Sequence, residues 1–275
     1  MDLDPDLAAL RPLGGFFVLR TVPAATAGTA AARTDALPTL ARAYAGAHDG
    51  AHDGNCAGAR AGACEKAGPD GRRDPLTHRV GTVRERLRAP EPRVAASIAH
   101  QALAARLWSV ALGCAARYGR LPDLDPRLLR WDTDATAPDD LWLTEVRALP
   151  GGAEPATLVD AVVHGHLEPL AAALRARHGV AAGLLWGNAG SALAGAAREL
   201  DRRARADGDA HLARRARALT AALFAHPRLR PTGTRTGLSF HRRSCCLYYR
   251  VPGGGICGDC CFTQPPRPSA RAASG

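Results

Sequence analysis

The sequence contains few aromatic residues and almost no methionine or lysine. Aromatic residues make up 5% of the 275 positions, and the chain has one Met and a single Lys, Lys66. Hydrophobic residues still account for 46%, and alanine dominates this fraction. Such a composition supports a sizeable core and favours helices over sheets. We therefore expect a mainly helical α+β protein, with a helical body and a few short strands.

Several sequence signals that would define other classes of protein are missing. There is no phosphate-binding loop of P-loop form, no dinucleotide fingerprint and no G-x-S-x-G elbow. A redox reaction would therefore draw its electrons from another protein. No run of 18 apolar residues is free of charge, and the acidic first residues do not resemble a signal peptide. We accordingly expect a cytoplasmic protein.

The net charge of +10 is concentrated in the last part of the chain. Residues 1–200 carry 22 basic and 22 acidic residues, whereas residues 201–275 carry 14 Arg against 4 Asp. A positively charged surface formed by these arginines would attract nucleic acid, an anionic membrane face or an acidic protein. An arginine-rich helix that is simply solvated explains the same pattern.

Five of the eight cysteines lie in one stretch, from His241 to Cys261. Outside small secreted proteins, this density indicates a metal site or redox chemistry. Pro252 and the three glycines that follow it allow the chain to fold back, so that distant thiolates can converge. The thiols are spaced as an adjacent pair, ten residues, and then a C-x-x-C pair: Cys245, Cys246, Cys257 and Cys260.

Coordination chemistry alone leaves three interpretations of these cysteines. Four thiolates can hold an iron–sulfur cluster or a structural zinc ion, and the thiols could also serve without a metal or in disulfides. Zinc sites usually have two spaced C-x-x-C pairs, whereas the first pair here has no spacer. Because a cluster with four thiolates is negatively charged, the flanking arginines would stabilise it. These are Arg242, Arg243 and Arg250.

The stretch R-R-S-C-C-L-Y-Y-R-V-P-G-G-G-I-C-G-D-C resembles the C-terminal signature of the FhuF-type siderophore-iron (ferric hydroxamate) reductases. The resemblance implies that Cys245, Cys246, Cys257 and Cys260 ligate one [2Fe–2S] cluster in a small C-terminal lobe. Cys261 lies outside the pattern. The segment from Leu185 to Asn188 also resembles this family, and it resembles the related C-terminal region of siderophore synthetases that need no peptide-synthetase template.

The resemblance implies a cytoplasmic reductase that transfers one electron to siderophore-bound Fe(III) and releases Fe(II). The substrate would be a ferric siderophore of the hydroxamate type, and the electron donor an external protein such as a ferredoxin. The basic C-terminal region is compatible with a peripheral contact on the inner membrane face, and no nucleic-acid partner is expected. Two alternatives are a zinc-stabilised basic module that binds nucleic acid and a plain iron–sulfur electron carrier.

Four residues are candidates for the substrate pocket. Trp186 and Asn188 lie in the family-like segment beside Gly187 and Gly190, which would let a ligand approach the backbone. Asn188 is also a residue type that caps helices, with Ser191 then in the first turn. Tyr248 and Tyr249 would line the edge of the cysteine loop, or simply pack it onto the body.

Local patterns predict the regular elements of the body. Helices are expected over residues 37–45, 92–118, 158–177, 184–205 and 209–225, with a kink at Pro169. Strands are expected over residues 15–22, 128–131 and 141–146, the last two as a pair, and a loop over residues 226–239. The chain divides into a reductase body over 1–240, with a flexible loop at about 46–74, a cluster-binding segment over 241–264 and a disordered tail over 265–275.

Other cysteines and histidines are weaker candidates for chemistry. His48, His52, Cys56 and Cys64 could bind a metal, although a duplicated Ala-His-Asp-Gly unit there is typical of a tolerant surface loop. A chelating pair of His164 and His166 would need non-helical backbone, since residues two apart do not share a helix face. His100 and Gln101 could face a pocket, but a hydrogen-bonded structural histidine is the simpler interpretation. Cys114 is expected to pack in the core.

Overall fold

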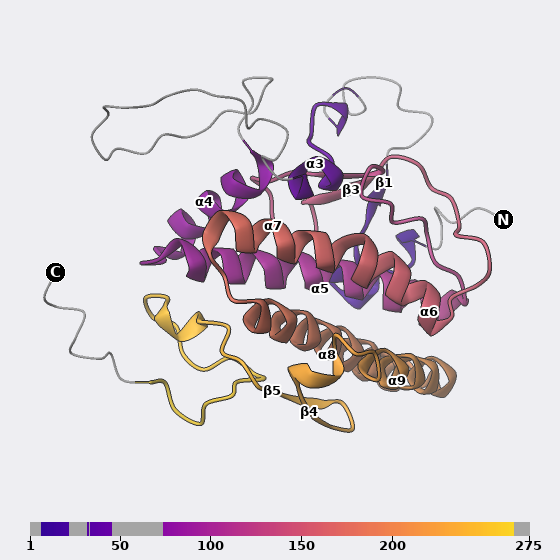
Figure 1. Cartoon of the computed structure of the whole chain (residues 1–275). Helices are drawn as coiled ribbons and strands as arrows, with labels where there is room; N and C mark the ends of the chain where they lie inside the picture. Colours follow the sequence, from indigo (N-terminus) through magenta and orange to yellow (C-terminus); the bar gives the residue numbers. More distant parts are fainter. Residues whose placement is uncertain (1–6, 22–31, 33, 46–73, 267–275) are drawn as a thin grey trace, which may run out of the picture.

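The structure, a computed structural model, describes residues 7–21, 32, 34–45 and 74–266 (Figure 1). It confirms the mainly helical α+β class, with long helices packed together and a few short strands at their edges. Within the described residues, no helix is long and apolar enough to cross a membrane. The expected histidine- and cysteine-containing loop over 46–73 and most of the expected tail lie outside the described residues.

Helix α5 (Pro92–Tyr118) forms the centre of the body, with the bounds that the sequence predicts. Pro92 occupies the first turn, and Gly119 ends the helix with φ of 68°, a conformation that suits glycine. The helix is buried on most sides, and Trp108 and Cys114 are fully buried. It packs against α4 (Pro75–Leu87), α8 (Ala182–Ala206) and α9 (Ala210–Phe224).

The expected helix over 158–177 is present as three consecutive helical segments, α6 (Pro155–Leu158), the π-helical η4 (Val159–Leu167) and α7 (Glu168–His178). Pro169 lies in the first turn of α7, where its missing N–H removes no hydrogen bond of the new helix. The π-helical segment ends at Leu167, directly before α7. The helix is therefore split next to Pro169, as the sequence predicts.

The two histidines of η4 do not form a chelating pair. His166 is buried, with Nδ1 2.9 Å from the hydroxyl of Tyr44 and Nε2 2.6 Å from the carbonyl oxygen of Leu124. His164 instead lies 3.0 Å from Glu168 at the surface. His164 therefore stabilises the surface of the helix, and His166 joins three parts of the body.

A small sheet has the order β1 (Arg20–Thr21), β3 (Leu141–Leu143), β2 (Leu129–Trp131). The predicted pairing of β2 and β3 is confirmed, and the two strands are antiparallel. The predicted strand over 15–22 is wrong for most of its length, because the chain forms the 3₁₀ turns η1 (Arg11–Leu13) and η2 (Gly15–Phe17). The carbonyl groups of Gly15 and Phe16 accept hydrogen bonds from the Arg106 side chain instead of from a neighbouring strand. The short helix α3 (Leu40–Tyr44) confirms the helix expected there.

The segment before the cysteines is a β-hairpin, so the prediction of a loop over 226–239 is wrong. The 3₁₀ turn η5 (Arg230–Thr232) leads into β4 (Gly233–Thr236), which pairs with β5 (Ser239–Arg242). Gly237 connects the strands with φ of 61°. Glycine in a two-residue turn between strands is a hairpin signal, and the prediction of a loop did not take this signal into account. The last residue of β5 is Arg242, where the cysteine-rich segment begins.

Candidate metal centre

The cysteine-rich segment lies against the body rather than forming a separate core. It follows β5, makes the 3₁₀ turn η6 (Tyr248–Arg250) and contacts α5 and α8 (Figure 1). Cys246 and Val251 are its buried apolar residues. Cys245, Cys257, Cys260 and Cys261 are partly exposed. Three of the four cysteines implied by the resemblance are thus partly exposed at the edge of the body, where a redox partner can approach them.

Each of these four sulfurs has a hydrogen bond from the backbone amide two residues further along the chain. The N–H of Leu247 donates to Cys245 Sγ at 3.2 Å, and that of Phe262 donates to Cys260 Sγ at 3.4 Å. Amide donors of this kind stabilise thiolates and tune iron–sulfur clusters. The corresponding amides are those of Tyr248 for Cys246 and Asp259 for Cys257. Cys261 differs, because the amide near its sulfur is its own.

The surroundings favour a thiolate at Cys246. The thiol of Cys257 donates a hydrogen bond to the Cys246 sulfur, which lowers the pKa of Cys246 to about 7 and raises the pKa of Cys257. Burial raises the pKa of Cys245. Since thiolates are the ligands of metals, the pairing of Cys246 with Cys257 suits a shared centre.

Arg242 places a buried positive charge beneath the cysteines. Its guanidinium group donates to Gln101 Oε1 at 3.2 Å, to the carbonyl of Ser244 at 3.1 Å and to Asn188 Oδ1. Its charge favours the thiolate forms of the nearby cysteines: it helps the Cys257 hydrogen bond to lower the pKa of Cys246, and it opposes the rise in the pKa of Cys257. Arg243 and Arg250, the other two arginines expected to offset the charge of a cluster, are exposed, and Arg250 pairs with Glu91. Arg242 is therefore the arginine of the three that is fixed at the centre.

Asn188 belongs to the hydrogen-bond network that holds the cysteine loop. It is fully buried, and its Nδ2 donates to the carbonyl of Ser97 at 2.8 Å and to Ser97 Oγ at 3.0 Å. The Ser97 hydroxyl in turn donates to the carbonyl of Cys246 at 2.7 Å. The helix-cap interpretation of Asn188 is wrong, because α8 begins at Ala182 and places Asn188 in its second turn. Ser191, expected in the first turn, lies in the third.

Two glycines of α8 allow the C-terminal segment to approach the helix closely. A Cβ atom at Gly187 would collide with the hydroxyl of Ser244, and one at Gly190 would lie 2.5 Å from Thr232 Oγ1. Real Cβ atoms do not make contacts this short, so either substitution would force the segment away. The glycines that were expected to admit a ligand instead admit the protein's own C-terminal segment, the hairpin region at Gly190 and the cysteine lobe at Gly187.

The other substrate candidates lie at the surface. Trp186 is partly exposed, and the guanidinium carbon of Arg228 lies 5.5 Å from the centre of its ring. Tyr249 makes an edge-to-face contact with Phe262, with ring centres 6.2 Å apart. Tyr248 is 41% exposed. The structure does not bring Trp186, Asn188, Tyr248 and Tyr249 together in a common cavity, and their role toward a substrate stays a prediction.

Asp259, between the two cysteines of the C-x-x-C pair, connects the lobe to α8. Its buried carboxylate accepts a hydrogen bond from Ser191 Oγ at 2.6 Å and forms an ion pair with Arg198 at 3.0 Å. Its carbonyl oxygen accepts from the amide of Arg242 at 3.0 Å. The two side-chain contacts carry no local sequence signal, because they join residues more than sixty positions apart.

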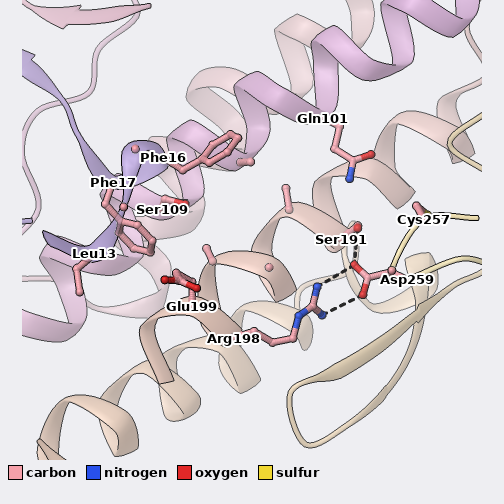
Figure 2. Close-up of a pocket in the computed structure, with 17 residues that line it drawn as sticks. Leu13, Phe16, Phe17, Gln101, Ser109, Ser191, Arg198, Glu199, Cys257 and Asp259 are labelled. Atoms are coloured by element: carbon pink, nitrogen blue, oxygen red, sulfur yellow. Dashed lines mark hydrogen bonds and ion pairs between the residues drawn. The ribbon is translucent and has the colours of Figure 1, made fainter. Parts of the chain in front are cut away.

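A cleft of about 440 Å³ opens beside the cysteine lobe (Figure 2). It lies between α5, α8 and the two 3₁₀ turns near the N-terminal end. Cys257, Gly258 and Asp259 close one end of it. A predicted cluster ligand therefore forms part of the wall of a solvent-open cavity.

His100 is buried near this centre and uncharged. Burial, together with the charge of Arg242, lowers its pKa to about 3. Its Nδ1 has no hydrogen-bond partner among the described residues. The expected structural role is thus supported by burial but not by a hydrogen bond at that nitrogen. Gln101, the next residue, does reach the cleft.

The donor set fits a two-iron cluster. In a [2Fe–2S] cluster each iron takes two protein ligands, so two pairs of thiolates suffice. With an amide donor at each sulfur and a buried arginine below, these features are those of an iron–sulfur protein.

Comparison with known families gives the particular class. Residues 101–237 match the family described as ferric iron reductase FhuF-like transporter, and residues 242–262 match the FhuF 2Fe-2S C-terminal domain. The chain belongs to the FhuF family of ferric iron reductases, and its cofactor is a [2Fe–2S] cluster. None of the curated proteins compared with the chain matches it.

Proposed function

We propose that this FhuF-family protein is a cytoplasmic reductase of siderophore-bound Fe(III), with hydroxamate siderophores as its substrates. One structural observation supports the proposal most strongly. Cys257, a predicted ligand of the cluster, lines a cleft of about 440 Å³ that is open to solvent. Cavities of this size accommodate small-molecule ligands. A chelate bound there would lie close to the cluster's edge.

Coordination chemistry explains why a single electron releases the metal. Hydroxamate oxygens are hard donors, which hold Fe(III) far better than the softer Fe(II). Held by Cys245, Cys246, Cys257 and Cys260, a [2Fe–2S] cluster would supply one electron at a time, taken from an external donor. With that electron the chelated Fe(III) would become Fe(II) and dissociate. No bond between the protein and the substrate forms or breaks in this step.

The protein's own groups hold the centre and set its electrostatics. Arg242 and the four backbone amides stabilise negative charge on the thiolates, so they favour the reduced state. Ser97 and Asn188 fix the loop that carries Cys246. These contacts position the cofactor, and the electron transfer itself requires no proton from them.

An acidic protein such as a ferredoxin fits the basic C-terminal part as the electron donor. The excess of arginine after residue 200 covers α9, the hairpin and the cysteine lobe. Opposite charges raise the rate at which two proteins meet. The same basic region would support a peripheral contact with an anionic membrane face.

A spectroscopic experiment separates the reductase from a plain electron carrier. Protein purified without oxygen is reduced chemically and mixed with a ferric tris-hydroxamate, while a ferrous chelator traps the released Fe(II). Reoxidation of the cluster with one Fe(II) formed per cluster supports the proposal. A cluster that stays reduced with every ferric siderophore, yet is oxidised by a small electron acceptor, would identify a carrier instead.

A further inference from the structure

The cleft beside Cys257 is built from four separated parts of the chain. Its apolar side comes from η1, η2 and small residues of the two long helices, and its polar side comes mainly from α5, α8 and the C-x-x-C pair (Figure 2). The apolar side is formed by Leu13, Phe16, Phe17, Ala105, Ala192 and Ala196. The polar side is formed by Gln101, Ser109, Ser191, Arg198, Glu199 and Asp259.

Phe16 presents an apolar ring to this cleft without support from a core. It is 46% exposed, whereas the neighbouring Phe17 is 2% exposed. Its backbone is nonetheless fixed, because Arg106 Nη1 donates to the carbonyls of Gly15 and Phe16 at 2.8 Å each. Arg106 is itself buried and paired with Asp140 at 2.9 Å. An exposed aromatic ring on a preorganised wall is a feature of ligand sites.

The charges around the cleft select the kind of ligand. The charged side chains that line the cleft are compensated, because Arg198 is paired with Asp259 and Glu199 is paired with Arg202. The negative charge at the site would therefore come mainly from the cluster at the Cys257 end. A strongly anionic ligand would be repelled, while an uncharged or cationic ligand with apolar parts would not.

From this arrangement we infer that the cleft is the binding site for a ferric chelate of low or positive charge, with Fe(III) bound at the Cys257 end. The inference rests on the proposed reductase function. An Fe(III) ion held by three hydroxamate groups carries no net charge, whereas one held by three catecholate groups is anionic. Phe16 and the alanines contact the chelate's hydrocarbon parts, and Gln101 and Ser109 donate hydrogen bonds to its amide carbonyls.

The surface formed by Trp186 and the cysteine-loop tyrosines is a weaker alternative. Asn188 is fully buried and engaged by Ser97 and Arg242, so it has no free surface for a ligand. The ring of Trp186 is covered in part by Arg228. The cleft, in contrast, brings open volume and a cluster ligand together.

Binding can be tested apart from reduction with Ga(III) chelates, because Ga(III) is not reduced by the cluster. Ala105→Phe places a ring in the cleft, and Ala102→Phe adds the same ring at an equally half-buried position of α5 that does not line it. Calorimetry with a Ga(III) tris-hydroxamate should show a dissociation constant that is at least about tenfold higher for Ala105→Phe, which corresponds to a loss of about 1.4 kcal/mol in binding free energy. The dissociation constant of Ala102→Phe should be unchanged. Both variants should keep the visible spectrum of the cluster.

Phe16→Ala provides a second test that does not depend on packing a larger side chain. Because this ring is exposed, its removal should leave folding intact and weaken binding several-fold. A Ga(III) tris-catecholate should bind the wild-type protein at least about tenfold more weakly than the tris-hydroxamate. Normal binding by both Ala105→Phe and Phe16→Ala, or tighter binding of the catecholate, would overturn the inference.

The proposed function can fail separately from this assignment. If the wild-type protein reduces ferric tris-hydroxamates while the two cleft variants bind and reduce them normally, the function stands and the site lies elsewhere. If the wild-type protein binds the Ga(III) chelate in the cleft but transfers no electron to the Fe(III) chelate, the site stands and the reductase function is wrong.

Discussion

The hydroxyl of Ser97 donates a hydrogen bond to the carbonyl oxygen of Cys246 at 2.7 Å, across 149 positions of the sequence. The bond is buried and joins the central helix α5 to the first cysteine pair. Asn188 of α8 and Arg242 of β5 complete the network around it. The cysteine loop is thus held by three elements of the body, and its geometry depends on all of them.

The ligand assignment predicts a clear difference between five cysteines. Replacing any one of Cys245, Cys246, Cys257 or Cys260 by Ser should remove or strongly alter the cluster's visible absorption, since each sulfur is expected to bind iron. Cys261→Ser is the matched control and should leave the spectrum unchanged. Iron and acid-labile sulfide analysis of each variant checks the outcome. Stoichiometric zinc with no sulfide in the wild-type protein would contradict the assignment.

Asn188→Ala should loosen the cysteine loop. The substitution removes one buried hydrogen-bond partner from Arg242 and one from Ser97, at an expected cost of about 1–3 kcal/mol in the free energy of unfolding. Faster loss of the cluster on exposure to an iron chelator should accompany it. Trp186→Ala is the comparison, since it removes a half-exposed ring from the same helix turn and should not affect the cluster. A stable cluster in Asn188→Ala, with weaker siderophore binding, would instead support a direct role in the pocket.

Gly187→Ala should disturb the docking of the cysteine lobe. The added methyl group would overlap the Ser244 hydroxyl, which itself donates to the carbonyl of Gly183 at 2.8 Å. Overpacking of this kind costs about 1–3 kcal/mol. Gly183→Ala in the same helix is the control, because a Cβ there would meet no atom within 4 Å. Thermal unfolding and cluster retention measure the effect, and equal behaviour of the two variants would contradict the predicted contact.

Electron transfer from an acidic ferredoxin should depend on salt. If the arginine-rich C-terminal part docks the donor, raising the ionic strength from about 50 to about 300 mM should slow cluster reduction several-fold, because salt screens charges beyond the Debye length. Stopped-flow absorbance at low ferredoxin concentration measures this rate. An uncharged chemical reductant is the control. A rate that does not change with salt would place the donor on another surface.

His166 should make stability depend on pH. Burial lowers its pKa to about 4, below the ordinary value of 6.5, so the unfolded chain binds a proton more readily. Its contribution to the free energy of unfolding is complete above pH 6.5 and falls by up to about 3 kcal/mol as the pH decreases toward 4. Urea unfolding at pH 7 and pH 5 should show this loss in the wild-type protein. The loss should be smaller in His166→Gln, and an equal pH dependence in both proteins would contradict the assignment.

Local signals predicted the elements whose ends are chemically marked. Pro92 and Gly119 defined α5, because a proline start and a glycine stop act within one helical turn. The strand expected over 15–22 failed for the opposite reason. The side chain of Arg106, about ninety residues further on, donates hydrogen bonds to the carbonyls of Gly15 and Phe16. No local sequence pattern reveals so distant a partner.

The same limit applies to the site. Cysteine spacing and the intervening residues indicated the cluster, since its ligands lie within sixteen consecutive positions. The segment around Gly187 and Asn188 was correctly recognised as distinctive, but its reason is contact with residues of the C-terminal lobe. The cleft was not predicted, because its walls come from residues near positions 15, 105, 195 and 258.

The position of the cysteines after α5 and α8 in the sequence has a consequence for biosynthesis. The ribosome makes this segment later than the two helices on which it docks. Domains generally begin to fold from the N-terminal side during synthesis. The body can therefore form before the thiolates appear, and iron delivery meets a prepared surface rather than an unfolded chain.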